Sequence, residues 1–214
     1  MSNLLPKVVI AGLGAAVSPV AVILLITVLF RDHARRNSLL FLAGFTLVLV
    51  AIGVISMTLM DSAGSGRTGR FDAYIDVALG ALCLAFIPVA VRRKPKSQRE
   101  AGAGDLGAWG AFSRGMLAML VNSSTMVIYI AGVHEISGAD ASFAGTVLAM
   151  AVLTAVTLLT LLIPIAIYFV WPRRAQKALG SMRAWLLGRS KVIGVALLTV
   201  FAAYFLAKGI IKLA

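Results

Sequence analysis

The stretch LLPKVVIAGLGAAVSPVAVILLITVLF, Leu4–Phe30, decides the class of the fold because it is apolar along almost its whole length. Its one charged side chain, Lys7, lies near its start. A helix needs roughly 20 such residues to cross about 30 Å of hydrocarbon, and this run is longer. A signal peptide would have a shorter apolar segment with its positive charges in front, whereas here the stronger basic cluster follows the run. The sequence therefore predicts a first membrane-spanning helix.

Five further apolar runs follow along the 214 residues. They are Leu39–Met60, Ala73–Val91, Phe112–Val133, Phe143–Trp171 and Val192–Leu213. Hydrophobic residues make up 60% of the chain and charged residues 13%, which lies outside the range of a soluble domain. The polar gaps are too short to bury a core of their own. We therefore expect one all-α membrane domain, residues 1–214, with six transmembrane helices.

The net charge of +12 would suggest nucleic-acid binding in a soluble protein, so its distribution along the chain has to be considered. Fifteen of the 20 Lys and Arg residues lie in the gaps after the first, third and fifth runs or, in the case of Arg114, at the adjoining end of the fourth run. By the positive-inside rule these gaps face the cytoplasm, which places both termini outside. The charge is thus explained by topology, and no nucleic-acid partner is expected.

Part of this basic charge belongs to an amphipathic segment, Arg173–Leu187. Its apolar residues share one side of a helical wheel, and its basic residues lie outside that arc. These basic residues are Arg173, Arg174, Lys177 and Arg183. The segment is expected to be a helix in the inner membrane interface, where it either contacts anionic lipid or serves as a plain connector.

Two polar interruptions fall near the middle of predicted spans. They are Ser18-Pro19 in the first run and Asn122-Ser123-Ser124-Thr125 in the fourth run. Pro19 removes a backbone hydrogen bond, and consecutive polar side chains are costly in hydrocarbon unless they face protein or water. Taken singly, the first interruption is also consistent with an ordinary proline kink, and the second with interhelical hydrogen bonds that only support packing.

The two interruptions occupy corresponding places in two three-helix halves of the chain. Residues 1–91 form the first half, residues 92–111 a cytoplasmic linker, and residues 112–214 the second half. Because each half has three spans, the halves run through the membrane in opposite directions. Paired, interrupted helices in inverted repeats indicate a central transport site. We therefore predict a substrate-binding site at Ser18, Pro19, Asn122, Ser123, Ser124 and Thr125.

The residues around the first interruption also carry a family resemblance. Ala16–Val20 (AVSPV), followed by RDHARRN at Arg31–Asn37 and the opening of the second run, resembles the start of the GAP (Sap-like) family of glycolipid- or sulfolipid-addressing proteins in the lysine exporter superfamily. The resemblance covers nearly the whole chain. The superfamily often has Asn-Pro-Lys in its fourth helix, where this chain has Asn122-Ser123-Ser124, so only Asn122 carries over.

This resemblance implies that the protein resides in the bacterial plasma membrane and exports or flips a lipidic, glycolipid-like precursor of the cell envelope. The wider relatives export amino acids and metal ions. Two alternatives to lipid export stay open: a small-solute exporter of the amino-acid type, and a non-transporting membrane subunit of a lipid-synthesis or secretion complex. No catalytic triad, Walker loop or dinucleotide fingerprint occurs, so an enzyme is not expected. Whether the chain forms a homo-oligomer also stays open.

Asp76 is the only acidic residue clearly inside an apolar run, and it lies near the outer end of the third. A helix N-terminus stabilises a carboxylate there, and the alternative role of Asp76 is proton coupling or contact with a cation. We expect Asp76 not to be a structural ion-pair partner, so that Asp76→Asn leaves folding nearly unchanged. His33 and His134 fall outside the runs, and Cys83 is the single cysteine. Neither a metal site nor a cofactor is expected, and a neutral or anionic substrate fits better than a cation.

Overall fold

The computed structural model of the chain describes residues 4–62, 69–92, 107–139 and 141–213, and within them it has eight helices and no strand. In chain order the helices are α1 (Leu4–Ala16), α2 (Pro19–Leu29), α3 (Ala34–Ser62), α4 (Gly69–Arg92), α5 (Ala108–Val121), α6 (Ser123–Ser137), α7 (Phe143–Val170) and α8 (Pro172–Leu213). The predicted all-α class is confirmed. Most of the predicted linker, residues 93–106, lies outside the described residues.

The first and fourth apolar runs are each divided into two helices. α1 and α2 meet at a bend of 59°, and α5 and α6 meet at a bend of 72°. Pro19 is the first residue of α2, where its missing N–H is tolerated, and the Ser18 Oγ caps that helix by accepting from the Ala21 N–H at 3.4 Å. Asn122 separates α5 from α6 without any proline. Both breaks thus fall at the predicted polar interruptions.

Three of the described helices are long and apolar enough to cross a membrane on their own, over Ala34–Met60, Phe143–Val170 and Arg174–Ile211. If each bent pair counts as one span, the number rises to at most five. The predicted third span corresponds to α4, whose described apolar part, Ala73–Pro88, is shorter than the others. The structure therefore has three to five candidate membrane spans rather than a demonstrated six.

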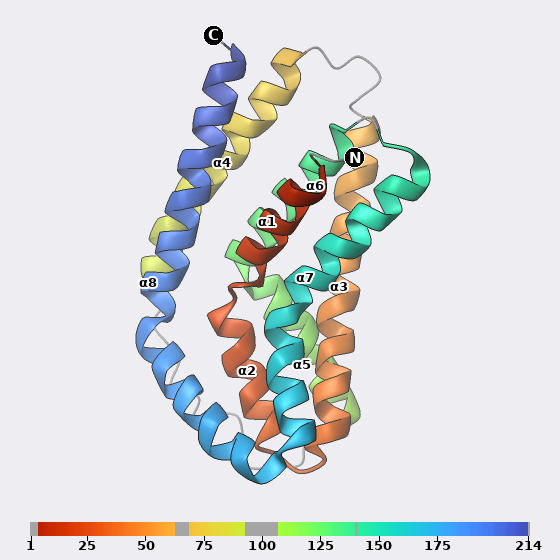
Figure 1. The fold of residues 1–214 in the computed structure, drawn as a ribbon. Coiled ribbons are helices and arrows are strands. Elements are labelled where there is room, and N and C mark those ends of the chain that lie inside the picture. Colours follow the sequence, from red (N-terminus) through yellow and green to blue (C-terminus); the bar gives the residue numbers. More distant parts are fainter. Residues whose placement is uncertain (1–3, 63–68, 93–106, 140, 214) are drawn as a thin grey trace.

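The order of elements repeats along the chain: a bent pair, a long helix and a further helix, and then the same again. In Figure 1 the pair α1–α2 runs downwards and the pair α5–α6 runs upwards, while the ends marked N and C lie at the same, upper end. α1 packs on α7, and α5 packs on α3. These two contacts are equivalent, because α1 and α5 occupy corresponding places in the two halves, and so do α3 and α7. α4 lies along α8 (Figure 1).

The backbones of α3 and α5 touch at two glycines. A Cβ on Gly115 would lie 2.0 Å from the carbonyl oxygen of Phe41, and a Cβ on Gly44 would lie 2.2 Å from that of Phe112. Small residues let membrane helices approach this closely, so van der Waals contact replaces the hydrophobic effect that is absent in lipid. The main core includes large, fully buried side chains from α3, α5 and α6, among them Phe41, Phe45, Leu49, Met119 and Tyr129.

We expected the amphipathic segment Arg173–Leu187 to be a helix of its own, but it is the first part of the 42-residue helix α8. This helix runs along the lower end of the molecule and then rises beside α4 (Figure 1). Three of its apolar side chains are buried in the main core: Ala175, Leu179 and Leu186. Its apolar face therefore covers protein as well as any lipid. Arg174 and Lys177 are exposed, Arg183 is half-buried, and the side chain of Arg173 lies outside the described part.

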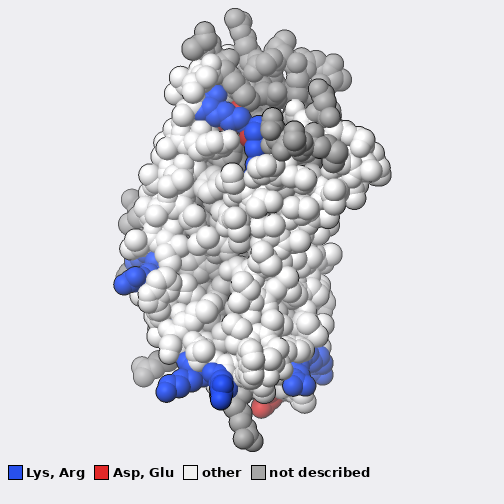
Figure 2. Space-filling model, in the orientation of Figure 1, with Lys and Arg blue, Asp and Glu red and all other residues white. Residues whose placement is uncertain are grey.

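Charged side chains concentrate at the two ends of the molecule. In Figure 2 Lys and Arg side chains gather at the lower end, where α3 begins and α7 ends. A smaller group of basic and acidic side chains lies at the upper end, and the visible face of the band between the two ends is uncharged except for basic atoms at its left edge. A largely uncharged belt between two charged rims is typical of a protein that crosses a bilayer.

Candidate functional site

The two helix breaks meet in the interior of the molecule. The Asn122 Nδ2 donates to the Oγ of Ser18, and also to the Oγ1 of Thr125 at 2.8 Å. The Thr125 hydroxyl in turn donates to the carbonyl oxygen of Ala15 at 2.9 Å. Ser18, Asn122 and Thr125 are each at most 3% exposed. These side chains, together with Ser124, form the central junction between the two bent pairs.

The central junction provides hydrogen-bond partners for backbone and side-chain groups that lack them because the helices are broken. The last turn of a helix has carbonyl groups without intrahelical partners, and Ala15 lies in the last turn of α1. Thr125 supplies the donor for that carbonyl. Ser124, which is half-buried, donates to the Asn122 Oδ1 at 3.1 Å. The bonds run from α1 and the start of α2 to α6, so they tie the first bent pair to the second.

Four of the six predicted site residues come together in this junction: Ser18, Asn122, Ser124 and Thr125. Pro19 is buried beside Ser18 as the first residue of α2. Ser123 is the first residue of α6, is half-buried, and takes no part in these bonds. The shared location of the two interruptions is therefore a feature of the structure, whereas their role in binding a substrate stays a prediction.

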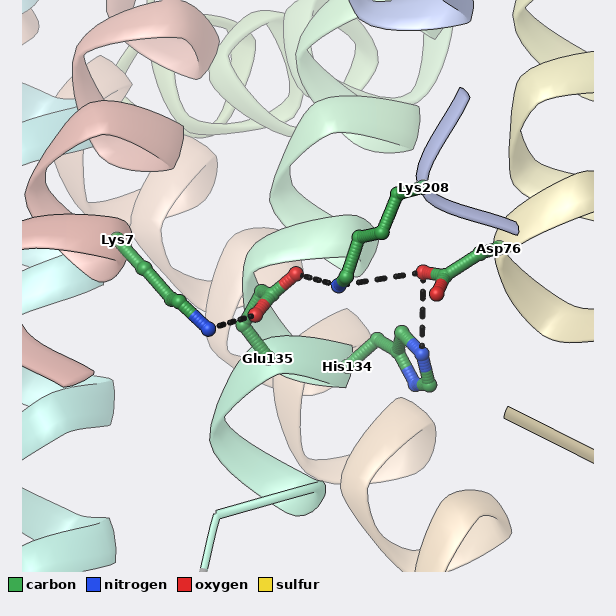
Figure 3. Close-up of polar contacts among 5 residues, drawn as sticks. All are labelled: Lys7, Asp76, His134, Glu135 and Lys208. Atoms are coloured by element: carbon green, nitrogen blue, oxygen red, sulfur yellow. Dashed lines mark hydrogen bonds and ion pairs between the residues drawn. The ribbon is translucent and has the colours of Figure 1, made fainter. Parts of the chain in front are cut away.

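A second polar group lies at the upper end of the molecule and is shown in Figure 3. We call it the terminal cluster, and its members are Lys7 of α1, Asp76 of α4, His134 and Glu135 of α6, and Lys208 of α8. The Asp76 Oδ1 lies 3.4 Å from the Lys208 Nζ and 3.4 Å from the His134 Nε2. The Glu135 carboxylate contacts Lys208 directly and lies 3.4 Å from the Lys7 Nζ. Ion pairs thereby link the four helices α1, α4, α6 and α8.

Two expectations about this cluster were wrong. Asp76 is fully buried and ion-paired, and it is therefore a structural partner. His134 lies inside α6 and is 3% exposed, because that helix continues to Ser137, beyond the end of the apolar run. One sequence signal could have revealed the pair: a lysine within the last run and an aspartate within the third are the natural counter-charges of each other, since unpaired charges are costly in a membrane. Among the described residues, no group of His, Cys, Asp and Glu side chains could hold a metal ion.

The chain matches a protein-family model over nearly its whole length. The family model described as Sap, sulfolipid-1-addressing protein, matches residues 8–211, a range that includes both helix breaks and all of the terminal cluster except Lys7. No curated protein and no solved structure matches the chain. Membership of the lysine exporter superfamily is consistent with the family match. Since the match covers almost the whole chain, this protein belongs to the Sap, sulfolipid-1-addressing protein family.

Proposed function

We propose that this protein is a multi-pass transporter of the bacterial plasma membrane that exports or flips a lipidic, glycolipid-like precursor of the cell envelope. The observation that carries the proposal is the central junction, in which Asn122 and Ser18 join two broken helices from the two halves of the chain. Broken helices that meet between repeats are the usual construction of a transport site. Membership of the Sap family supports a role in lipid or glycolipid export or addressing.

The proposal includes six spans, arranged as two inverted three-helix repeats with both termini outside. α4 then serves as the third span beside α8, which it contacts along its length (Figure 1). Support comes from the repeated order of elements, the opposite directions of the two bent pairs, and the basic side chains at the lower end (Figures 1 and 2). The lower end would be cytoplasmic.

The central junction would bind the polar part of the substrate. α2 and α6 both begin there, at Pro19 and Ser123, so the positive ends of two helix dipoles lie at the same place. A neutral or anionic headgroup is favoured by this arrangement over a cation. In the present conformation Asn122, Ser18 and Thr125 bond to one another, and a headgroup would replace these bonds. The substrate-binding residues proposed are those of the two interruptions: Ser18, Pro19, Asn122, Ser123, Ser124 and Thr125.

Anionic lipid of the inner leaflet is proposed as a partner of the basic side of α8. Arg174 and Lys177 are exposed there, and Arg173 and Arg183 belong to the same side of the helix in the sequence pattern. The Arg189 guanidinium lies 5.2 Å from the centre of the exposed Trp185 ring, an arrangement suited to a membrane interface. Each basic side chain near an anionic surface contributes about 1 kcal/mol of attraction.

One alternative has a specific observation in its favour. The polar groups of the central junction satisfy one another, as they would in a non-transporting subunit that uses them only for packing. Lipidomics of a deletion strain separates the two functions. Loss of a transporter leaves the precursor intact but accumulating inside the cell, whereas loss of a subunit needed for synthesis reduces the total amount of the lipid. An unchanged lipid inventory would contradict both.

A further inference from the structure

We propose that His134 and Asp76 form a proton-binding site that controls how tightly the upper end of α8 is held against α4. The proposal rests on the proposed transport function, to which it adds a coupling ion. His134 and Asp76 come from different helices and are 3% and 0% exposed. Buried titratable groups within membrane helices commonly mark proton pathways, because their burial is otherwise unfavourable.

The key geometric feature is one oxygen shared by two nitrogens. The Asp76 Oδ1 lies 3.4 Å from the His134 Nε2 and 3.4 Å from the Lys208 Nζ (Figure 3). The other ring nitrogen of His134, Nδ1, is buried and has no hydrogen-bond partner among the described residues. That nitrogen is the acceptor for an incoming proton, since a neutral imidazole with its Nε2 directed at a carboxylate keeps its lone pair on Nδ1.

The charges of the terminal cluster change in a simple way when the proton binds. With a neutral imidazole, Lys7 and Lys208 balance Asp76 and Glu135, and the cluster is neutral (Figure 3). A proton taken from water onto the His134 Nδ1 leaves a net charge of one positive unit, and its release to water restores neutrality. The imidazolium then serves as the counter-charge of Asp76, and it repels the neighbouring Lys208 ammonium. Proton binding therefore loosens Lys208, and with it α8, from Asp76 on α4.

The surroundings contain few other groups that could take this role. Tyr204, one turn before Lys208 on α8, interacts with that lysine electrostatically and is about half exposed. α7, which packs on α1 and α6, has no charged residue anywhere in Phe143–Val170. In α3 and α4 the side chains of Asp61, Arg70 and Asp72 lie outside the described part. His134 is the one histidine in the cluster, and the only other histidine of the chain is His33.

The position of the cluster connects proton binding to the central junction. Lys7 lies on α1 and Glu135 on α6, and these two helices are the halves of the bent pairs that extend from the junction to the upper end (Figure 1). Lys208 of α8 contacts Glu135 of α6 and Asp76 of α4 at the same time. A change in the charge of His134 therefore acts on the lysine that joins α8 to α6, one of the two half-helices that extend from the junction.

The first test measures proton binding itself and needs no substrate. Full-length protein carrying ¹⁵N-labelled histidine and the exchange His33→Asn gives one imidazole signal, because His134 is then the only histidine. Asparagine suits the positive φ of 55° at residue 33. We expect the signal to titrate, with the proton affinity about tenfold lower in Asp76→Asn and higher in Lys208→Met. Lys191→Met, which removes an exposed lysine of α8, is the matched control and should have no effect. An unchanged titration in Asp76→Asn, or an imidazole that never protonates before the protein unfolds, would overturn the proposal.

The second test measures the mechanical consequence. Spin labels on cysteines placed at Tyr74 of α4 and Ile211 of α8, both more than 60% exposed, report the distance between these helices in a Cys83→Ala background. We expect acidification to lengthen or broaden this distance, and His134→Gln to abolish the change. A response that persists in His134→Gln, or no response in the parent protein, would contradict the coupling. These readouts are independent of transport, whereas loss of the proposed function would appear only in the lipid inventory.

Discussion

Asn122 donates a hydrogen bond to Ser18 across 104 residues of sequence, at the point where each of the two bent helix pairs is broken. Burying either side chain without a partner would be unfavourable, because an isolated amide or hydroxyl in an apolar interior loses its hydrogen bonds to water. Their contact allows both helices to be interrupted at once. The same contact joins the two halves of the chain through polar groups.

A double-mutant cycle should detect this contact. Ser18→Ala and Asn122→Ala are expected to show a coupling energy of about 0.6 kcal/mol, with an upper range near 1.7 kcal/mol, as for other hydrogen bonds between membrane helices. Ser18→Ala alone also removes the N-cap of α2, which adds roughly 0.5–2 kcal/mol to its cost. Reversible unfolding in mixed detergent provides the measurement. Ser113, whose hydroxyl bonds only within α5, is the control, and equal coupling of Asn122 to Ser113 would refute a specific contact.

Two glycine substitutions should differ in their effect on stability, because Gly115 lies in the α3–α5 contact and Gly188 does not. Gly115→Ala places a Cβ 2.0 Å from a backbone oxygen that cannot move alone, so we expect a loss of about 1–3 kcal/mol in the free energy of unfolding. Gly188→Ala in α8 meets nothing within 4 Å, and it should be neutral or stabilising by up to about 1 kcal/mol because alanine favours the helix. Thermal unfolding of both variants tests the prediction. Equal stability of the two would contradict the close approach.

Burial of Asp76 reverses the expectation drawn from the sequence for its substitution. Asp76→Asn removes the counter-charge of Lys208 and should destabilise the protein by about 1–3 kcal/mol, less than a fully buried pair because Lys208 keeps Glu135 and is 21% exposed. Asp76→Asn combined with Lys208→Met should recover part of that loss. The melting temperatures of the two variants decide the matter, and an unchanged melting temperature in Asp76→Asn would show that the pair contributes nothing.

Hydropathy alone predicted most of the helices, because membrane spans depend on length and apolarity more than on particular contacts. Phe143–Trp171 became α7 over Phe143–Val170, and the second run lies within α3, which is longer by one turn at its start. The two breaks were also predictable, since Ser18-Pro19 and the polar run from Asn122 are local signals that act on the backbone directly.

Hydropathy did not predict which of the distant helices lie next to one another. The pairing of Asp76 with Lys208 depends on α4 lying along α8, and hydropathy does not specify which helices are neighbours. The continuity of α8 was missed for a related reason. No proline follows Pro172 within α8, so the polar segment and the last span form one helix whose early apolar residues, Ala175 and Leu179, find a place in the core.

Orientation in the membrane can be tested with introduced cysteines. In a Cys83→Ala background, cysteines at Ser65 and Ala139 should react with an impermeant thiol reagent in intact cells, and one at Ser97 should not. The reason is that Lys and Arg concentrate in the gaps after the first, third and fifth runs, which the positive-inside rule places in the cytoplasm. Ser97 lies in the gap after the third run. Labelling at Ser97 alone would place the basic gaps outside and invert the topology.

The most direct test of the central claim is complementation of a deletion strain with Asn122→Leu, with the lipid at the cell surface and inside the cell measured separately. Leucine cannot donate to Ser18 or Thr125, and the cost to stability should be only about 0.6–2 kcal/mol, so we expect normally inserted, monodisperse protein that fails to restore the surface lipid. Ser124→Ala, which removes one bond to Asn122, should restore most of it. Full restoration by Asn122→Leu would contradict a transport site at the central junction.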